Sequence, residues 1–547
     1  MESAAGDAST AGKDESRKHY KPAARAVMPT RLFLVLAAAL LVVRVPAIVQ
    51  PMGADQGLYA YVGQRILAGD LPYRDAWDQK PPAIHYTYAL MRALWPGDGA
   101  VGAADLLAAG AVAWLLYRIG AVTGSPPAGA VAAVLFLLLS NPSLTRLGGI
   151  RLRAQCETFI AVVAAGGLLL LLDRAAGTRP LKAFAAGLLF GVAFLFKYNA
   201  GIYLVSGVLA AWLWRRIAWR DLAWVGAGFA LPLVVVGAIF AAGGALGDLY
   251  AATITYNLRY SGETYAGPIA VVRYLLAFPI ERASVDALWT VGGAGCLILI
   301  PSAVGRRERL VAPLWVAAAC LSIAVNGSRG LPQYFVQANP ALALAAGWGA
   351  IAAWALIKAR AGRHGTAVGL AAVVVVAVAV WRVDQFPKLL EQTRFDARYA
   401  LGRIDRETYL SRYGDDRKFS ALSSAALADT IRARTRGSDT VYVFGFTCGA
   451  YVQADRVSAS RFFWSRPVIA GFAADRPGYG IGGLLAELQR HAPALVALQR
   501  KDWAPDVSDS AEFFMRTEPL AGWLETNYVR TDGPEAFDVW IRKDGRS

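Results

Sequence analysis

The chain has 547 residues, of which 56% are hydrophobic, and its mean hydropathy is +0.38. This is too apolar for a soluble protein of that length and indicates a polytopic membrane protein. The net charge of +16 comes from Lys and Arg in short clusters between apolar runs, and no basic stripe interleaved with aromatic residues follows them, so a nucleic-acid partner is excluded.

The amino-terminal 30 residues are polar and rich in Ala, Ser and Lys, which predicts a disordered cytoplasmic tail over 1–30. The apolar run that begins at Leu32 has the composition of a signal peptide. Its leader is long, however, no small-residue cleavage site follows, and more apolar runs come after it. We therefore interpret it as an uncleaved first transmembrane helix with its amino terminus inside.

Apolar runs long enough to span a bilayer, or nearly so, predict a polytopic α-helical protein with about eleven transmembrane helices between residues 31 and 385. The predicted spans are 31–50, 100–119, 127–141, 157–173, 182–196, 199–214, 222–243, 286–304, 309–325, 334–357 and 366–383.

The connecting segments alternate in character, and this alternation predicts the topology. Short basic loops at 174–182, 215–220, 306–309 and 358–363 belong on the cytoplasmic side by the positive-inside rule. Longer segments of mixed charge and aromatic residues belong outside, at 51–99, 142–156, 244–285 and 326–333. Ten candidate site residues then converge on one outer face: Asp55, Asp78, Lys80, Arg151, Arg153, Glu157, Lys197, Asn257, Tyr260 and Tyr334.

The composition changes near Phe386, where charged residues increase and apolar runs shorten to the length of strands. We predict strands at 440–446, 494–499 and 537–543, and helices at 420–435 and 483–491. Residues 386–547 are therefore predicted to form an extracytoplasmic α/β domain after the last span. No internal repeat is evident, which weighs against the repeated folds of secondary transporters.

The first outer loop, 51–99, carries the densest polar chemistry. Asp55 has the position of a general base for a hydroxyl at the membrane edge, and its alternative role is that of a helix N-cap. Asp75, Asp78 and Lys80 follow, and Pro81-Pro82 stiffens the backbone after the lysine. A lysine fixed in this way suits an anionic phosphate, whereas the alternative is a surface loop stabilised by salt bridges.

Charged residues also flank later spans. Glu157 lies at the mouth of the fourth span, with Arg151 and Arg153 just before it, and we expect one of these arginines to pair with Glu157. Lys197 ends an apolar run and Arg44 lies near the outer end of the first span, and their alternative role is to extend toward the interface without a site function.

Cysteine and histidine residues argue against a zinc site. The four cysteines form no CxxC pair, and the four histidines are scattered. The cysteines are predicted to be small core residues, with pairing of Cys156 and Cys448 outside the membrane as the alternative.

Three short segments resemble a known group of enzymes: Asp55-Gln56-Gly57-Leu58-Tyr59-Ala60, Gly69 to Asp75, and Trp77-Asp78-Gln79-Lys80-Pro81-Pro82. They are similar to the first external loop of bacterial relatives of the protein O-mannosyltransferases and of lipid A aminoarabinose transferase, which share the GT-C fold. Glu157, Lys197 and the Gln333-Tyr334 pair resemble later landmarks of the group. The likeness covers roughly residues 40–345.

The resemblance implies a glycosyltransferase of the bacterial cytoplasmic membrane that works on its outer face, in contact with membrane lipid. The donor would be a sugar linked to polyprenyl phosphate, and the acceptor a lipid, glycan or protein of the envelope. Asp55 matches the acidic position to which the family assigns catalysis, and Lys80 matches a lysine close to the donor phosphate. Many relatives carry Asp-Glu where this chain has Asp55-Gln56, so the sequence does not support a divalent metal bridged by two carboxylates.

Two other functions are compatible with the sequence. A transporter or flippase for a lipid-linked saccharide is the main alternative, although transporters place ionisable groups near the bilayer midplane rather than at one end. A non-catalytic relative that assists envelope assembly is the other.

Overall fold

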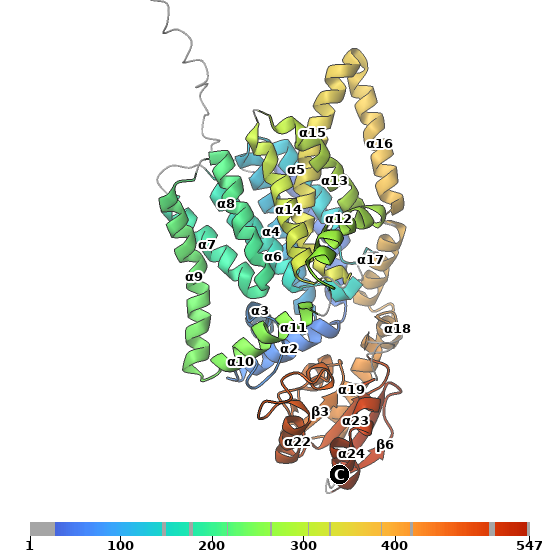
Figure 1. Cartoon of the computed structure of the whole chain (residues 1–547). Coiled ribbons are helices and arrows are strands. Elements are labelled where there is room, and N and C mark those ends of the chain that lie inside the picture. The colour runs from blue at the N-terminus through green and yellow to red at the C-terminus, as the bar shows by residue number, and fades with distance from the viewer. Residues whose placement is uncertain are drawn as a thin grey trace, which may run out of the picture.

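The computed structural model describes residues 28–144, 149–173, 179–215, 217–262, 265–304, 306–327, 330–383, 386–415, 419–502 and 509–543. A large helical bundle forms the first part of the chain, and a smaller domain built on a β-sheet follows at one end of it (Figure 1).

A helix coincides with each of the eleven predicted spans. The first is α1 (Thr30–Ala39), which continues through a π-helical turn (η1, Leu40–Arg44) and a 3-10 turn (η2, Val45–Val49). The others are α4 (Gly99–Val122), α5 (Pro126–Leu139), α6 (Cys156–Leu172), α7 (Arg179–Phe196), α8 (Gly201–Arg215), α9 (Trp219–Ala242), α13 (Ala287–Leu299), α14 (Val311–Val325), α15 (Asn339–Ala361) and α16 (Gly365–Val383). Six stretches of the described chain are helical, long and apolar enough to cross a membrane, and α5, α6 and α13 are shorter apolar helices. The number that cross the membrane stays a prediction.

Small residues bring the helices of the bundle close together. A Cβ atom on Gly187 of α7 would lie 2.0 Å from the carbonyl oxygen of Val225 in α9, and one on Gly228 of α9 would lie 2.0 Å from that of Phe184. Close approach of backbones through glycine is typical of helices packed in a membrane, where dispersion contacts replace hydrophobic burial.

Two of the predicted outer loops are largely helical. Residues 51–99 contain α2 (Ala54–Leu67) and α3 (Ala83–Leu94). Residues 244–285 contain α10 (Leu246–Tyr250), a π-helical turn (η6, Ala251–Thr255), α11 (Tyr256–Gly262) and α12 (Pro268–Val285). The apolar side chains of α12 recur at helical spacing and are exposed on one face, as at Ile269, Leu276 and Ile280. Arg273, Glu281 and Arg282 interrupt its apolar residues, which is why the sequence did not predict a span here.

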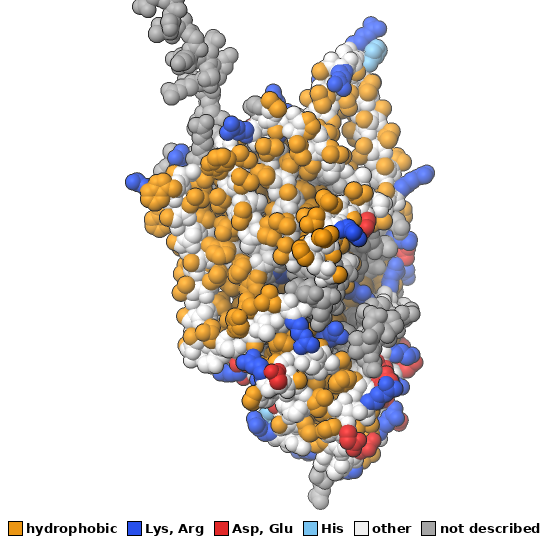
Figure 2. All heavy atoms as spheres, in the orientation of Figure 1, with side chains coloured by type: hydrophobic (Ala, Val, Ile, Leu, Met, Phe, Trp, Pro, Cys, Tyr) orange, Lys and Arg blue, Asp and Glu red, His pale blue; other side chains and the backbone are white. Residues whose placement is uncertain are grey.

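The two ends of the bundle differ as the alternating loops predicted. Helices α2, α3, α10 and α11 lie at the end next to the carboxy-terminal domain, and the hairpin between α15 and α16 lies at the opposite end (Figure 1). In the view of Figure 2, hydrophobic side chains dominate the bundle, Lys and Arg side chains lie toward both of its ends, and Asp and Glu side chains lie mainly toward the domain. The assignment of the domain end to the outside of the cell stays a prediction.

The carboxy-terminal region is an α/β domain, and strands lie where the sequence predicts them. Its five-stranded sheet has the order β4-β3-β5-β7-β6, with β3 parallel to β4 and β5, and β7 antiparallel to β5 and β6. The strands are β3 (Thr440–Phe444), β4 (Val457–Ser458), β5 (Leu495–Gln499), β6 (Tyr528–Thr531) and β7 (Phe537–Arg542). The short strands β1 (Gly414–Asp415) and β2 (Phe419–Ser420) form a separate antiparallel pair.

Helices surround this sheet and connect it to the bundle. Two of them, α19 (Ala421–Arg434) and α22 (Gly480–His491), coincide with predicted helices. The others are α17 (Phe386–Ala400), α18 (Arg406–Ser411), α20 (Gly449–Ala454), α21 (Arg466–Ile469), α23 (Ser510–Arg516) and α24 (Glu518–Asn527).

The domain packs directly on the first outer loop. Gly57 of α2 faces Gly449 of α20 so closely that a Cβ on Gly57 would lie 2.6 Å from the Gly449 nitrogen. Trp77 donates its backbone N–H to the Arg461 carbonyl at 2.8 Å, and its own carbonyl accepts from the Trp464 indole N–H at 3.0 Å. The fully buried Trp77 ring lies among the rings of Trp464, Phe472 and Tyr256. The loop that carries the candidate residues is therefore held from both sides.

Candidate functional site

Asp55 lies in the first turn of α2, half-buried between the bundle and the carboxy-terminal domain. It does not cap the helix, because the N-cap residue is Gly53 and no side chain accepts the cap hydrogen bond. The Gln155 side-chain amide donates to the Asp55 carboxylate at 3.4 Å. Burial raises the pKa of the Asp55 carboxyl above its usual range, although the charges of Lys80 and Lys197 act in the opposite direction. A carboxyl with a raised pKa is a stronger base when ionised.

Lys80 is held by its backbone rather than by its charge. Tyr73 adopts φ +70°, a conformation that costs a non-glycine residue free energy, and its buried hydroxyl donates to the Lys80 carbonyl at 2.8 Å. Asn257 supports the same segment, since its side-chain amide donates to the Gln79 carbonyl at 2.7 Å. Within the described part of the chain, the half-buried Lys80 ammonium forms no hydrogen bond or ion pair.

The electrostatic environment keeps Lys80 charged. Burial lowers the pKa of its ammonium, but nearby tyrosine and thiol groups and the carboxylates of Asp55 and Asp78 outweigh burial and raise the pKa above its usual range. Lys80 therefore offers a fixed positive charge close to Asp55.

Asp78 is buried next to a histidine that the sequence did not single out. One of its carboxylate oxygens accepts from the Gln79 backbone N–H at 2.7 Å, and the other lies 3.3 Å from His85 Nε2. His85 is completely buried in the first turn of α3, and its ring meets the rings of Tyr59 and Tyr73 edge to face. Its position three residues after Lys80-Pro81-Pro82 was the available signal. Asp75, in contrast, pairs with Arg74 at 2.7 Å, as the surface-loop alternative expected.

Glu157 pairs with Lys197, so the expectation that an arginine is its partner was wrong. Glu157 lies in the first turn of α6, Lys197 follows the end of α7, and both side chains are buried. The Lys197 ammonium bonds the Glu157 carboxylate and lies 4.2 Å from the centre of the Tyr334 ring. The alternative that Lys197 extends toward the interface is also wrong. Glu157 and Lys197 both act on Asp55 electrostatically, so the chain does bring them to the same site.

Arg153 belongs to a buried network beside this site. Its guanidinium donates to the Gln50 side chain and to the Ser143 hydroxyl, each at 2.7 Å, and lies 3.3 Å from the Asp105 carboxylate. This engagement leaves Arg153 turned away from Glu157.

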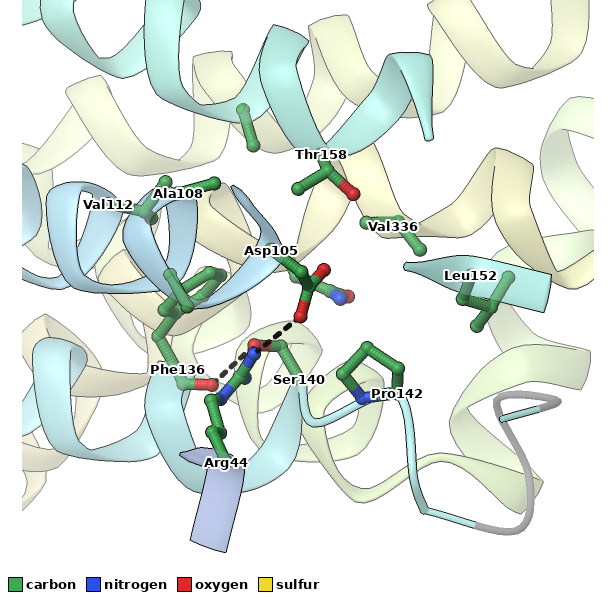
Figure 3. Close-up of a pocket in the computed structure, with 13 residues that line it drawn as sticks. Arg44, Asp105, Ala108, Val112, Phe136, Ser140, Pro142, Leu152, Thr158 and Val336 are labelled. Carbon is green, nitrogen blue, oxygen red and sulfur yellow. Dashed lines mark hydrogen bonds and ion pairs between the residues drawn. The ribbon is translucent and has the colours of Figure 1, made fainter. Parts of the chain in front are cut away.

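Arg44 shares the Asp105 carboxylate and is buried rather than extended to the interface. Its guanidinium donates to the Leu137 carbonyl at 3.1 Å and to the Ser140 hydroxyl at 2.8 Å, and it lies 3.7 Å from Asp105. Figure 3 shows Arg44 and Asp105 pointing toward each other beside a cavity of about 30 Å³, enough for a water molecule. The two arginines and one carboxylate leave this interior with an excess positive charge.

Gln56 explains one departure from the family pattern. Its buried side-chain amide donates to the carbonyls of Ile150 and Arg153, both at 2.8 Å. A glutamate at this position has no N–H to offer these oxygens and would repel them. Gln56 thus fixes the short 3-10 helix η4 (Gly149–Leu152) against the start of α2.

The remaining candidate residues are placed as follows. Arg151 is exposed in η4, and its carbonyl accepts from Gln155 at 2.7 Å. Asn257 and Tyr260 both lie in α11, but the Tyr260 side chain is outside the described residues.

Cys156 and Cys448 are buried and unpaired, so the alternative of a disulfide is wrong. In the described ranges, no three His, Cys, Asp or Glu side chains lie close enough together to hold a metal ion.

Comparisons with known proteins identify the fold. No sequence-family profile and no curated protein matches the chain. The crystal structure of ArnT from Cupriavidus metallidurans bound to undecaprenyl phosphate superposes with a TM-score of 0.56, at 16% identity, over 95% of this chain and 100% of that one.

Two larger proteins superpose less well. The archaeal oligosaccharyltransferase AglB from Archaeoglobus fulgidus has a TM-score of 0.46 at 11% identity, over 94% of this chain and 74% of that one. The mycobacterial arabinofuranosyltransferase AftD has a TM-score of 0.48 at 16% identity, over 94% of this chain and 42% of that one. It is the match to ArnT along nearly the whole of both chains that confirms the resemblance predicted from the first outer loop, and the chain has the GT-C fold.

Proposed function

We propose that the chain is a glycosyltransferase that moves a sugar from a polyprenyl-phosphate donor to an acceptor of the cell envelope. The observation that carries the proposal is that a candidate base and a candidate phosphate-binding cation lie at the same site. A half-buried carboxylate with a raised pKa, Asp55, lies beside a charged lysine, Lys80, whose ammonium has no ionic partner among the described residues. The shared fold with ArnT, whose structure holds undecaprenyl phosphate, supports the choice of donor.

The proposed reaction is a displacement at the anomeric carbon of the sugar. Asp55 accepts the proton of the acceptor hydroxyl, and the hydroxyl oxygen forms the new glycosidic bond as the bond to the phosphate oxygen breaks. Both electrons of the broken bond leave with polyprenyl phosphate, whose added negative charge Lys80 stabilises. The family resemblance implies inversion at the anomeric carbon.

The other candidate residues support these two groups. Asn257 and Tyr73 fix the backbone around Lys80, and Asp78 acts on Asp55 through its charge. Lys197 and Arg153 already have carboxylate partners, which favours supporting roles over direct contact with the donor phosphate. We place the site on the outer face of the cytoplasmic membrane, where the alternating loops predict it.

The test compares wild type with Asp55→Asn, Lys80→Ala and a control, Asp75→Asn, in the same loop. Purified proteins receive a panel of polyprenyl-phosphate sugars with an envelope-lipid extract as acceptor, and the release of polyprenyl phosphate is measured. General base catalysis contributes about 10²–10⁴-fold, so we expect Asp55→Asn to lose at least 100-fold of the turnover. Asp75→Asn should stay within a few-fold, because Asp75 pairs with Arg74 away from Asp55.

The outcome separates this proposal from the transporter alternative. Turnover in detergent, without a second compartment, is expected of a transferase and not of a flippase. Folded wild type that consumes no donor, or an Asp55→Asn variant with full turnover, would contradict the proposal.

A further inference from the structure

A second cavity, of about 270 Å³, opens where the bundle meets the carboxy-terminal region. The bundle contributes η4 and the residues just after the first span, and the carboxy-terminal region contributes α17 and the segment before β1. Six polar side chains line the cavity: Gln50, Ser143, Arg151, Gln392, Arg412 and Tyr413. Ile150 is the one large apolar residue among the described lining residues.

The polar wall of this cavity is held in place by a buried carboxylate behind it. Asp396 accepts from Gln50 at 2.7 Å, from Gln392 at 2.8 Å, from Tyr413 at 2.6 Å and from Tyr409 at 2.9 Å. Three of these donors, Gln50, Gln392 and Tyr413, line the cavity, and further hydrogen bonds from Arg153 to Gln50 and from Gln392 to Tyr413 fix their directions. Such preorganisation reduces the entropy lost when a ligand binds.

Arg412 is also held in position. Its guanidinium donates to the Glu391 carboxylate at 2.9 Å and lies 4.5 Å from the centre of the Phe395 ring. Because Glu391 offsets its charge, Arg412 offers the cavity directed N–H donors more than a net positive field.

The chemistry of this wall selects the kind of ligand. Among the described lining residues one large side chain is apolar, so this part of the wall has little to offer a lipid tail or an apolar peptide side chain. Carboxamides and hydroxyls both donate and accept, and the arginines donate, which matches a group with many hydroxyls. The volume is close to the ~300 Å³ at which small-molecule sites begin. A sugar unit fits both the chemistry and the size.

One side chain connects the cavity wall to the proposed base. The Gln155 amide donates to the Arg151 carbonyl at 2.7 Å and to the Asp55 carboxylate at 3.4 Å, so one side chain links the wall of the cavity to Asp55.

We propose that this cavity binds a saccharide unit of the acceptor, which makes the acceptor a glycan or a glycolipid rather than a bare protein hydroxyl. That the bound saccharide belongs to the acceptor rests on the proposed function. Binding of a saccharide in the cavity does not depend on turnover.

The test measures binding of free sugars to the full chain in lipid nanodiscs, without sugar-based detergent. The probes are glucose, galactose, mannose, arabinose and their common disaccharides at millimolar concentration, observed by saturation-transfer NMR. We expect at least one probe to give a signal with wild type and equally with Asp55→Asn. Arg412→Ala should lose at least fivefold of that signal, and Arg412→Lys should keep part of it.

The matched control is Arg406→Ala, because Arg406 is an exposed arginine on α18 that pairs with Asp429 at 3.5 Å and does not line the cavity. Absence of a signal for every probe, or a signal unchanged in both Arg412 variants, would overturn the proposal. Because Asp55→Asn is expected to bind sugars without turnover, failure of the cavity proposal can be distinguished from failure of the proposed function.

Discussion

Lys80 differs from the neighbouring basic side chains in what it contacts. Lys197 bonds Glu157 and faces the Tyr334 ring, and Arg153 has three polar partners. A cation that already has a carboxylate partner gains less from a phosphate, because the new contact must compete with the old one. Lys80 has its backbone fixed and its ammonium available, so it can respond to charge that develops on a leaving group.

The charges around Asp55 predict how activity depends on pH. Asp55 acts as a base only when ionised, and burial raises its pKa, so kcat/KM should fall on the acidic side at a pH above the usual range of an aspartate. Lys80 lowers the pKa of Asp55, so Lys80→Gln should move this acidic limb of its residual activity to higher pH. Asp75→Asn should leave the limb in place. If the acidic limb of the pH profile stays at the same pH in Lys80→Gln, this would argue against an electrostatic interaction between Lys80 and Asp55.

Helix α2 joins two parts of the chain that are far apart in sequence. Its first turn carries Asp55, its Gly57 touches α20, and its Tyr61 hydroxyl accepts from the Ser458 backbone N–H at 2.8 Å. The rings of Tyr451 and Phe463 pack on Tyr61. The position of Asp55 thus depends on the fit between α2 and the carboxy-terminal domain.

A methyl group at Gly57 tests this fit. Alanine is favoured over glycine in a helix by about 1 kcal/mol, but here its Cβ would meet the Gly449 backbone, and overpacking costs about 1–3 kcal/mol. We expect Gly57→Ala to unfold at a lower temperature than wild type and to lose turnover. Gly226→Ala is the control, since Gly226 is exposed on α9 with nothing within 4 Å of its added Cβ. Equal unfolding temperatures for Gly57→Ala and wild type would contradict the close contact.

At the scale of the whole molecule, a chain of buried polar contacts connects the interior of the bundle to α17 in the carboxy-terminal region. Asp105 contacts Arg153, Arg153 donates to Gln50, and Gln50 donates to Asp396. Because each member is buried, loss of one leaves the next without its partner, and such an unsatisfied group costs about 1–3 kcal/mol. The contacts therefore couple the placement of α17 to that of the first span.

Removal of the Asp396 carboxylate should loosen the two parts from each other. Asp396→Asn replaces an acceptor of four hydrogen bonds with a group that must itself donate. We expect faster proteolytic cleavage between residues 401 and 413 and weaker sugar binding in the second cavity. Asp429→Asn, a change at an exposed carboxylate of α19, serves as control. Cleavage at the wild-type rate would show that Asp396 does not hold this junction.

Local patterns explain which features the sequence could predict. Eleven apolar runs marked the helices, and strands β3, β5 and β7 stood out as short apolar segments. The motif of the first outer loop and the alternation of the loops predicted that Asp55, Lys80, Glu157 and Lys197 lie at one end of the bundle, and these groups do interact electrostatically. The ion-pair partner of Glu157 was harder to predict, because two arginines are near it in sequence, whereas Lys197, its actual partner, is near it only in space. The cavity at α17 and the contact of Gly57 with Gly449 depend on residues hundreds of positions apart, for which a single sequence carries no local signal.

The packing of Trp77 on Trp464 also has a consequence for biosynthesis. The two residues are 387 positions apart, and ribosomes add about 5–20 residues per second, so the loop waits roughly 20 to 80 s for its partner. During that interval Trp77 lacks the rings that later bury it, which makes the nascent loop a target for chaperones and proteases. A chain released after the last predicted span but before residue 464 would hold every predicted span and yet lack the surface that shapes its loop. Quality control that senses this exposed loop would remove incomplete chains selectively.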